Sequence, residues 1–166
     1  LIGGNSGDAL TDADFNVAVG NGSLSSDTLG SHSVALGHFA LRSQHHTTAT
    51  DAYNVAVGSQ AGTSVTTGVR NTLIGGLAGD ALTDADRNVA IGYQALTTDT
   101  LGSRSVAIGH NALSVQNFTS ATDSFNTAVG HEAGAAVTSA TGSTLIGALA
   151  GDALTQGARN VAVGTA

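Results

Sequence analysis

A short motif that ends in glycine recurs along the whole chain, and this repetition restricts the fold more than any other feature. The motif reads Asn/Ser-Val-Ala-Ile-Gly, with Thr, Leu and Val as its common replacements. Ten glycines close it: Gly3, Gly20, Gly37, Gly58, Gly75, Gly92, Gly109, Gly130, Gly147 and Gly164. Along the numbering, consecutive motif glycines are separated by 17, 17, 21, 17, 17, 17, 21, 17 and 17. Periods of this length indicate a solenoid, whose repeats are stable only when stacked on their neighbours.

Four of these repeats form a larger unit, which spans residues 1–72 and recurs as residues 73–144. The two copies agree at 43 of 72 positions, and residues 145–166 begin a third copy. We therefore treat residues 1–166 as one repeat segment rather than as several domains. The chain begins at Leu1-Ile2-Gly3, inside a motif, so we interpret it as a segment of a longer fibrous protein.

The columns of the repeat predict short parallel strands. Side chains alternate between the two faces of a strand, so the residues one and three before each motif glycine share a face. This face is aliphatic or Thr, and we expect it to line the interior of the coil, with the Ala column facing outward against another surface. The predicted fold is an all-β, parallel β-solenoid of ten rungs, whose lengths follow a 17/17/21/17 pattern. At the usual strand spacing of about 4.8 Å per rung, the rod is roughly 48 Å long.

A column of Asn and Ser lies four residues before the motif glycines, at Asn54, Asn71, Asn88 and Ser105 for example. In a stack of rungs these side chains lie above one another. They can then hydrogen-bond along the stack and satisfy the backbone groups of the turns. We therefore expect a polar ladder along the rod.

The composition fits strands and turns and excludes several partners. The chain contains 23 Gly and lacks Pro, Cys, Met, Trp and Lys, and eleven of its twelve acidic residues are Asp. Residues that favour turns thus replace the usual helix formers. The formal net charge of −7 argues against nucleic-acid binding and against docking on an anionic membrane. No segment is apolar and long enough for a membrane-spanning helix, so we expect no membrane insertion by this segment.

Two stretches carry a family resemblance: Asn88-Val89-Ala90-Ile91-Gly92 and Ser105-Val106-Ala107-Ile108-Gly109, each with a small residue three places later. They resemble the head repeats of trimeric autotransporter adhesins (YadA-like), and the ten motifs extend this resemblance along the whole chain. The rungs are longer and less uniform than the usual adhesin repeat. Residues 71–83 and 88–96 look more like tail-fibre repeats of marine bacteriophages. The resemblance implies a left-handed β-roll, a homotrimer, and display on a virion or on the bacterial outer surface for attachment.

The two long rungs are the predicted sites of receptor contact. Their extra residues fall in 42–48 and 114–120, where the sequences of the two long rungs agree least. Insertions in repeat arrays map to loops on one face, which is often the binding face. The candidate contact residues for a host-surface glycan or protein are Arg42, His45, His46, Tyr53, Phe118 and Phe125.

Metal binding and catalysis find weaker support in the sequence. The recurring acids Asp8, Asp12, Asp14, Asp80, Asp84 and Asp86 are candidate Ca²⁺ ligands, but capping of turns explains them better. His38, His110 and His131 each follow a motif glycine and would meet around a trimer axis only if that column faced it. We expect no cofactor and no bound metal. Because the acids lie in loops at repeat intervals, we also expect no carboxylate cluster for catalysis and no enzymatic activity.

The repeats predict a rigid fibre segment, and the family resemblance implies that it is extracellular, trimeric and presents loops for attachment. The alternative is a pure spacer or structural filament without a receptor site of its own. Ice binding is disfavoured because Thr-x-Thr does not recur from rung to rung. A carbohydrate-active solenoid is disfavoured by the scattered acids.

Overall fold

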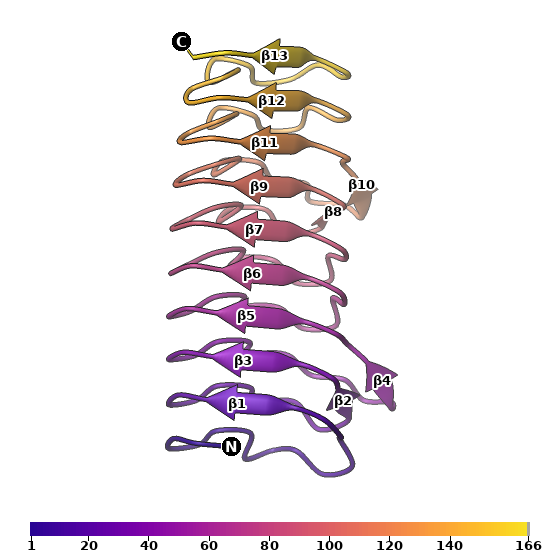
Figure 1. The fold of residues 1–166 in the computed structure, drawn as a ribbon. Coiled ribbons are helices and arrows are strands. Elements are labelled where there is room, and N and C mark those ends of the chain that lie inside the picture. Colours follow the sequence, from indigo (N-terminus) through magenta and orange to yellow (C-terminus); the bar gives the residue numbers. More distant parts are fainter. Residues whose placement is uncertain (166) are drawn as a thin grey trace.

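The chain folds into a single straight coil of stacked rungs with one long parallel sheet along its side (Figure 1). The computed structural model describes residues 1–165. Nine strands form the sheet, and all are three residues long: β1 (Val17–Val19), β3 (Val34–Leu36), β5 (Val55–Val57), β6 (Thr72–Ile74), β7 (Val89–Ile91), β9 (Val106–Ile108), β11 (Thr127–Val129), β12 (Thr144–Ile146) and β13 (Val161–Val163). Ile2 adds an isolated parallel bridge to Val19 below the sheet. This is the parallel β-solenoid that the repeat spacing predicted.

The register of the sheet follows the sequence columns. Val89 pairs with Val106, Ala90 with Ala107, and the same positions pair throughout the stack. Four two-residue strands accompany the long rungs and form two small ladders: β2 (Gly30–Ser31) with β4 (Thr50–Asp51), and β8 (Gly102–Ser103) with β10 (Thr122–Asp123). In Figure 1 the strands in front run leftward as the chain rises from its N-terminus, so the coil is left-handed. Within residues 1–165, no helix is long and apolar enough to span a membrane.

The assignment of strand faces from the sequence was wrong. The Ala column is the inner one, and Ala18, Ala35, Ala56, Ala90 and Ala107 are fully buried. The aliphatic residues before and after each Ala point outward and are half-buried or exposed. The reason is the thinness of the coil, because its interior is already filled by Leu and Val from the opposite turns. Only a small side chain fits on the strand that faces them.

Packing between Leu and Gly explains the long period of four rungs. In the strands β6 and β12, the inner position holds Leu73 and Leu145 instead of Ala, and both are buried. The glycines Gly62 and Gly79 make room for Leu73, since a Cβ on either would come within 2.6–2.7 Å of a Leu73 methyl carbon. In the rungs of β1, β3, β7 and β9, whose inner residue is Ala, Leu fills the equivalent position, as at Leu96. The large residue at this packing site therefore comes from the strand in some rungs and from the following turn in others.

The motif glycine keeps adjacent rungs in close contact. Gly92 has φ of +134°, and a Cβ there would lie 2.5 Å from the carbonyl oxygen of Gly109 in the next rung. Gly109 meets Gly130 in the same way, at 2.3 Å. A side chain at this column would push the rungs apart, which is why glycine recurs there.

The predicted polar ladder is present and buried. The side-chain oxygens of Asn54, Asn71 and Asn88 each accept a hydrogen bond from the backbone N–H of the same column one rung later, at 2.8–2.9 Å. Their amide nitrogens donate to the carbonyls of Gly68, Ala85 and Gly102, at 2.7–2.8 Å. Each Asn thus satisfies backbone groups that would otherwise be buried without partners.

The Leu–Gly packing gives a test by double substitution. Leu73→Ala leaves a cavity between two glycines and should lower the free energy of unfolding by about 2–5 kcal/mol. Gly79→Leu overpacks the same layer and should cost about 1–3 kcal/mol. The combined variant restores the arrangement of the rungs that have Ala on the strand and Leu in the turn. In urea unfolding it should therefore lose less unfolding free energy than the two single variants lose together. Strict additivity would contradict the packing explanation.

Candidate functional surfaces of the rod

A buried polar network joins each long rung to the rung before it. In the first copy, Asp27 is fully buried, and its carboxylate accepts hydrogen bonds from the backbone N–H of Gly30 (3.1 Å) and of His46 (3.0 Å). The amide of Gln44 donates to its other oxygen at 2.6 Å, and the Gln44 oxygen accepts from Asn54 at 2.8 Å. The extra residues of the long rung thus deliver a glutamine that links the carboxylate to the Asn ladder.

The second copy repeats this network with the same chemistry. Asp99 accepts from the backbone N–H of Gly102 and Phe118 and from Gln116, and the Gln116 oxygen accepts from Asn126. Burial raises the pKa of Asp99, and the hydrogen bond from Gln116 is the largest effect that opposes the rise. Because this carboxylate is sealed inside the coil, its role is structural. The recurrence of Asp and Gln at a fixed separation is visible in both copies of the sequence, but it does not by itself indicate a buried pair.

The six predicted receptor contacts divide into two groups. Arg42, His45, Tyr53 and Phe125 are exposed. His46 and Phe118 occupy equivalent positions and are buried, with 4% and 8% of their surfaces exposed. Their backbones are fixed by the hydrogen bonds to Asp27 and Asp99, which turn both side chains inward. Divergence between the loops therefore reflects a change in packing at this position as well as a change in surface.

Tyr53 and Phe125 belong to a longer column of exposed and half-buried side chains that was not anticipated. It lies five residues before the motif glycines and contains Phe15, His32, Tyr53, Arg70, Arg87, Arg104, Phe125 and Arg159. All of these residues have φ between 50° and 63°, and we call the set the aromatic–arginine column. A comparison of residues at this fixed offset from the glycines would have found it in the sequence.

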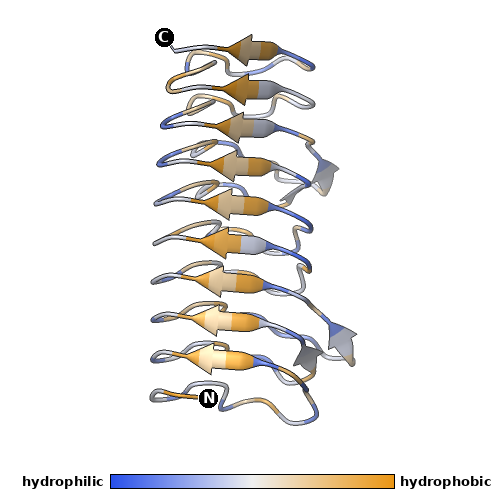
Figure 2. Cartoon of the chain, viewed as in Figure 1, coloured by the Kyte–Doolittle hydropathy of each residue, from blue (hydrophilic) through white to orange (hydrophobic). Residues whose placement is uncertain are grey.

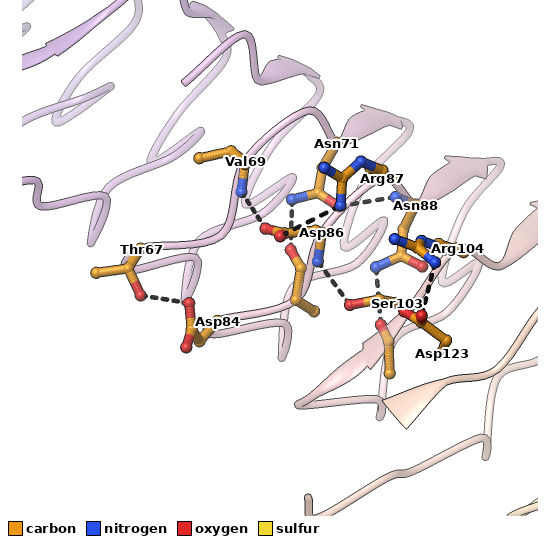
Figure 3. A network of polar contacts seen from close by, with 12 residues as sticks. Thr67, Val69, Asn71, Asp84, Asp86, Arg87, Asn88, Ser103, Arg104 and Asp123 are labelled. Carbon is orange, nitrogen blue, oxygen red and sulfur yellow. Dashed lines mark hydrogen bonds and ion pairs between the residues drawn. The ribbon is translucent and has the colours of Figure 1, made fainter. Parts of the chain in front are cut away.

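Side chains of the aromatic–arginine column stack along the rod. The ring centroids of Phe15 and His32 are 4.9 Å apart, and those of His32 and Tyr53 are 4.8 Å apart. The Arg104 guanidinium lies 5.5 Å from the centre of the Phe125 ring and pairs with Asp123 at 2.6 Å. Figure 3 shows Arg87 and Arg104 in adjacent rungs beside Asp86 and Asp123, with the Asn ladder next to them.

The recurring acids lie on the surface of the turns. Asp84 accepts a hydrogen bond from the Thr67 hydroxyl at 2.6 Å, and Asp86 accepts from the backbone N–H of Val69 at 2.8 Å (Figure 3). The Asp80 carboxylate accepts from Thr97, and burial raises the pKa of Asp80. Asp8, Asp12 and Asp14 lie in the equivalent turns of the first copy, and all three are exposed. These contacts connect neighbouring rungs, as turn-capping residues do.

The three histidines that follow motif glycines do not all meet. His38 lies beside Phe39, with ring centroids 3.8 Å apart. His110 and His131 stack on each other at 5.1 Å in adjacent rungs, and Tyr93 continues the stack at 5.8 Å.

No family model, curated protein or solved structure matches this chain. The β-solenoid part of the family resemblance is confirmed by the fold, and the adhesin or tail-fibre part stays a prediction.

Acidification should destabilise the chain through His46. Burial lowers the pKa of His46, the Asp27 carboxylate opposes this, and His45 reinforces it. A lowered pKa in the folded state means that stability is present above the unfolded value of 6.5 and is lost as the pH falls through the folded value. His46→Phe, which copies Phe118, should therefore reduce the loss of stability between about pH 7.5 and pH 5.5, the range in which imidazole titrates.

The measurement is urea unfolding at both pH values and one protein concentration. His45→Asn copies the exposed Asn117 and serves as the matched control, which should keep most of the acid sensitivity. An unchanged pH dependence in His46→Phe would contradict this assignment.

Proposed function

We propose that this chain is a rigid, non-enzymatic segment of a trimeric attachment fibre, displayed on a virion as part of a tail fibre or on the bacterial outer surface as an adhesin. The observation that carries the proposal is the outward face of the nine-stranded sheet. We define the outward stripe as the first and third residues of these nine strands. Every one of them is Val, Leu, Ile or Thr.

The outward stripe is mainly apolar along the whole rod, and its exceptions are the Thr residues that begin β6, β11 and β12. Figure 2 shows the hydrophobic colour on all nine strands, in contrast with the mixed turns. Leu36 and Ile74 are 43% and 37% exposed, and Val89, Ile91 and Val106 are half-buried. Continuous apolar surfaces of this kind mark interaction sites on soluble proteins. A single coil leaves this face in water.

Further copies of the same chain fit this face better than an unrelated partner. Their rungs share one vertical spacing, so each strand of one copy faces a strand of the next in every layer. Rods that lie parallel and in register are related by a rotation about a common axis, which gives a closed cyclic assembly. The family resemblance implies three copies. Burying the stripe also adds to the small core of each coil.

Charge placed on the outward stripe should prevent assembly. Ile91→Asp with Ile108→Asp puts two carboxylates into the proposed interface, and burying each without a partner costs several kcal/mol. The side chains lie outside the core, so the coil itself should keep its circular dichroism. Light scattering should show trimers for the unaltered chain and monomers for the double variant.

Two further variants complete this test. Thr98→Asp lies on an exposed turn and should remain trimeric. Ala90→Asp buries a charge inside the coil and should unfold it, which separates loss of folding from loss of assembly. A stable folded monomer of the unaltered chain, or a trimer of the double variant, would contradict the proposal.

Attachment would use the surface around the long rungs. Arg42, His45, Tyr53 and Phe125 are exposed there. The aromatic–arginine column joins rings and guanidinium groups on one edge of each chain, and such side chains are frequent anchors in binding surfaces. Three chains present each contact three times, so weak contacts to a surface glycan or protein gain avidity.

Removing two rings should weaken attachment. On an array of immobilised cell-surface glycans, Tyr53→Ala with Phe125→Ala should reduce retention of the trimer by about tenfold or more, because avidity multiplies each loss. Tyr93→Ala removes an exposed ring from a different column and should retain binding. Equal retention of the double variant and the unaltered chain would contradict this contact surface.

A spacer without a receptor site is the second candidate. It is favoured by the burial of Gln44, His46, Gln116 and Phe118, because these residues of the long rungs serve packing and internal hydrogen bonds. Absence of binding by the unaltered trimer, together with intact assembly, would favour this spacer.

A further inference from the structure

We propose that His110, His131 and Glu132 form a binding site for a divalent transition-metal ion, with Zn²⁺ as the best-suited ion. The sequence alone led us to expect no metal. The geometry points to one, since the candidate donor atoms of these three residues all lie within 4.8 Å of one another. No Asp of the recurring acidic turns belongs to this cluster.

The donors are held in place by the ladder of the coil. His110 follows Gly109 after β9, and His131 follows Gly130 after β11, so the two imidazoles stand in adjacent rungs. The rings are 5.1 Å apart and within 7° of parallel. The backbone N–H of Glu132 donates to the carbonyl of His110 at 2.8 Å, and that of Leu149 donates to the carbonyl of His131 at 2.8 Å. Both segments are therefore fixed on either side of the cluster.

Glu132 completes the set of donors. Its carboxylate lies 3.8 Å from the Nε2 atom of His131. It is the only Glu among the twelve acidic residues of the chain, and its side chain is one methylene longer than that of Asp. Two imidazoles and one carboxylate match the nitrogen and oxygen donors that Zn²⁺ accepts, with a fourth position left for water.

The required adjustment is small. Around Zn²⁺, with bonds of about 2.0–2.2 Å, tetrahedral donor atoms lie about 3.4 Å apart. The present spread of up to 4.8 Å closes by rotation of side chains, since both imidazoles are exposed and Glu132 is half-buried. The backbone can remain in register. A bound ion would connect two consecutive rungs and stabilise the folded coil in proportion to its occupancy.

The first copy of the four-rung unit supplies an internal comparison. His38 corresponds to His110, but Ser59 and Gln60 stand where the second copy has His131 and Glu132. The fold therefore accepts Ser and Gln at these positions. Histidine and glutamate occur together only in the second copy, although 43 of 72 positions are identical between the copies. Two of the substitutions between the copies thus add two metal donors next to an existing one.

The proposed site does not depend on the trimer or on attachment, because all three donors come from one chain. The test is titration of the unaltered protein with Zn²⁺ alone by calorimetry, combined with thermal unfolding. We expect one ion per chain and a rise in melting temperature, with weaker binding on acidification because imidazole binds metal only when unprotonated. Mg²⁺ and Ca²⁺, which prefer oxygen donors, should produce neither effect.

Two matched variants decide the assignment. His131→Ser with Glu132→Gln converts the site to the first copy, and Zn²⁺ affinity should fall at least about 100-fold, since loss of even outer-shell partners costs 10–100-fold. Ser59→His with Gln60→Glu builds the same cluster in the first copy and should raise the stoichiometry to two ions per chain. Unchanged affinity in the first variant, or no added ion in the second while its circular dichroism is intact, would overturn the proposal.

Discussion

The close approach of consecutive rungs at the motif glycines is the constraint on which the rest of this structure depends. A Cβ on Gly92 would lie 2.5 Å from the carbonyl oxygen of Gly109, so the column admits no side chain. This contact, with the parallel hydrogen bonds beside it, holds every rung in register with the next. Identical sequence positions therefore lie above one another, and each column of the repeat becomes one line of side chains along the rod.

The thin coil that results places unusual demands on its interior. Its strands contribute mostly Ala, and the larger Leu73 requires glycine at two facing positions. Backbone groups that a thicker protein would satisfy with further secondary structure are satisfied here by buried Asn and, next to the long rungs, by buried Asp such as Asp99. The other large aliphatic residues of the strands therefore remain on the outer face of the sheet. In our proposal this same exclusion creates the surface that joins three chains.

Regular stacking also explains how the chain can acquire binding surfaces without a change of fold. Exposed columns carry whatever side chains each rung provides, as at Tyr93, His110 and His131, and neighbouring rungs bring them within about one strand spacing of each other. The two copies of the four-rung unit share a core but differ on such columns. The proposed attachment surface and the proposed metal site both follow from differences of this kind.

The sequence by itself determined the parallel solenoid, its register, the four-rung unit and the Asn ladder, because these follow from spacing and from the stacking of identical positions. It also located the exposed Tyr53 and Phe125, but not the column that connects them to Arg104. Only the tertiary structure decided which face of each strand is inside, since alternation separates two faces without orienting them. That choice depends on how Leu73 and its counterparts fill the opposite wall. Likewise, the burial of His46 and Phe118 and the meeting of His110 with Glu132 depend on the path of the chain between strands, which no repeat spacing specifies.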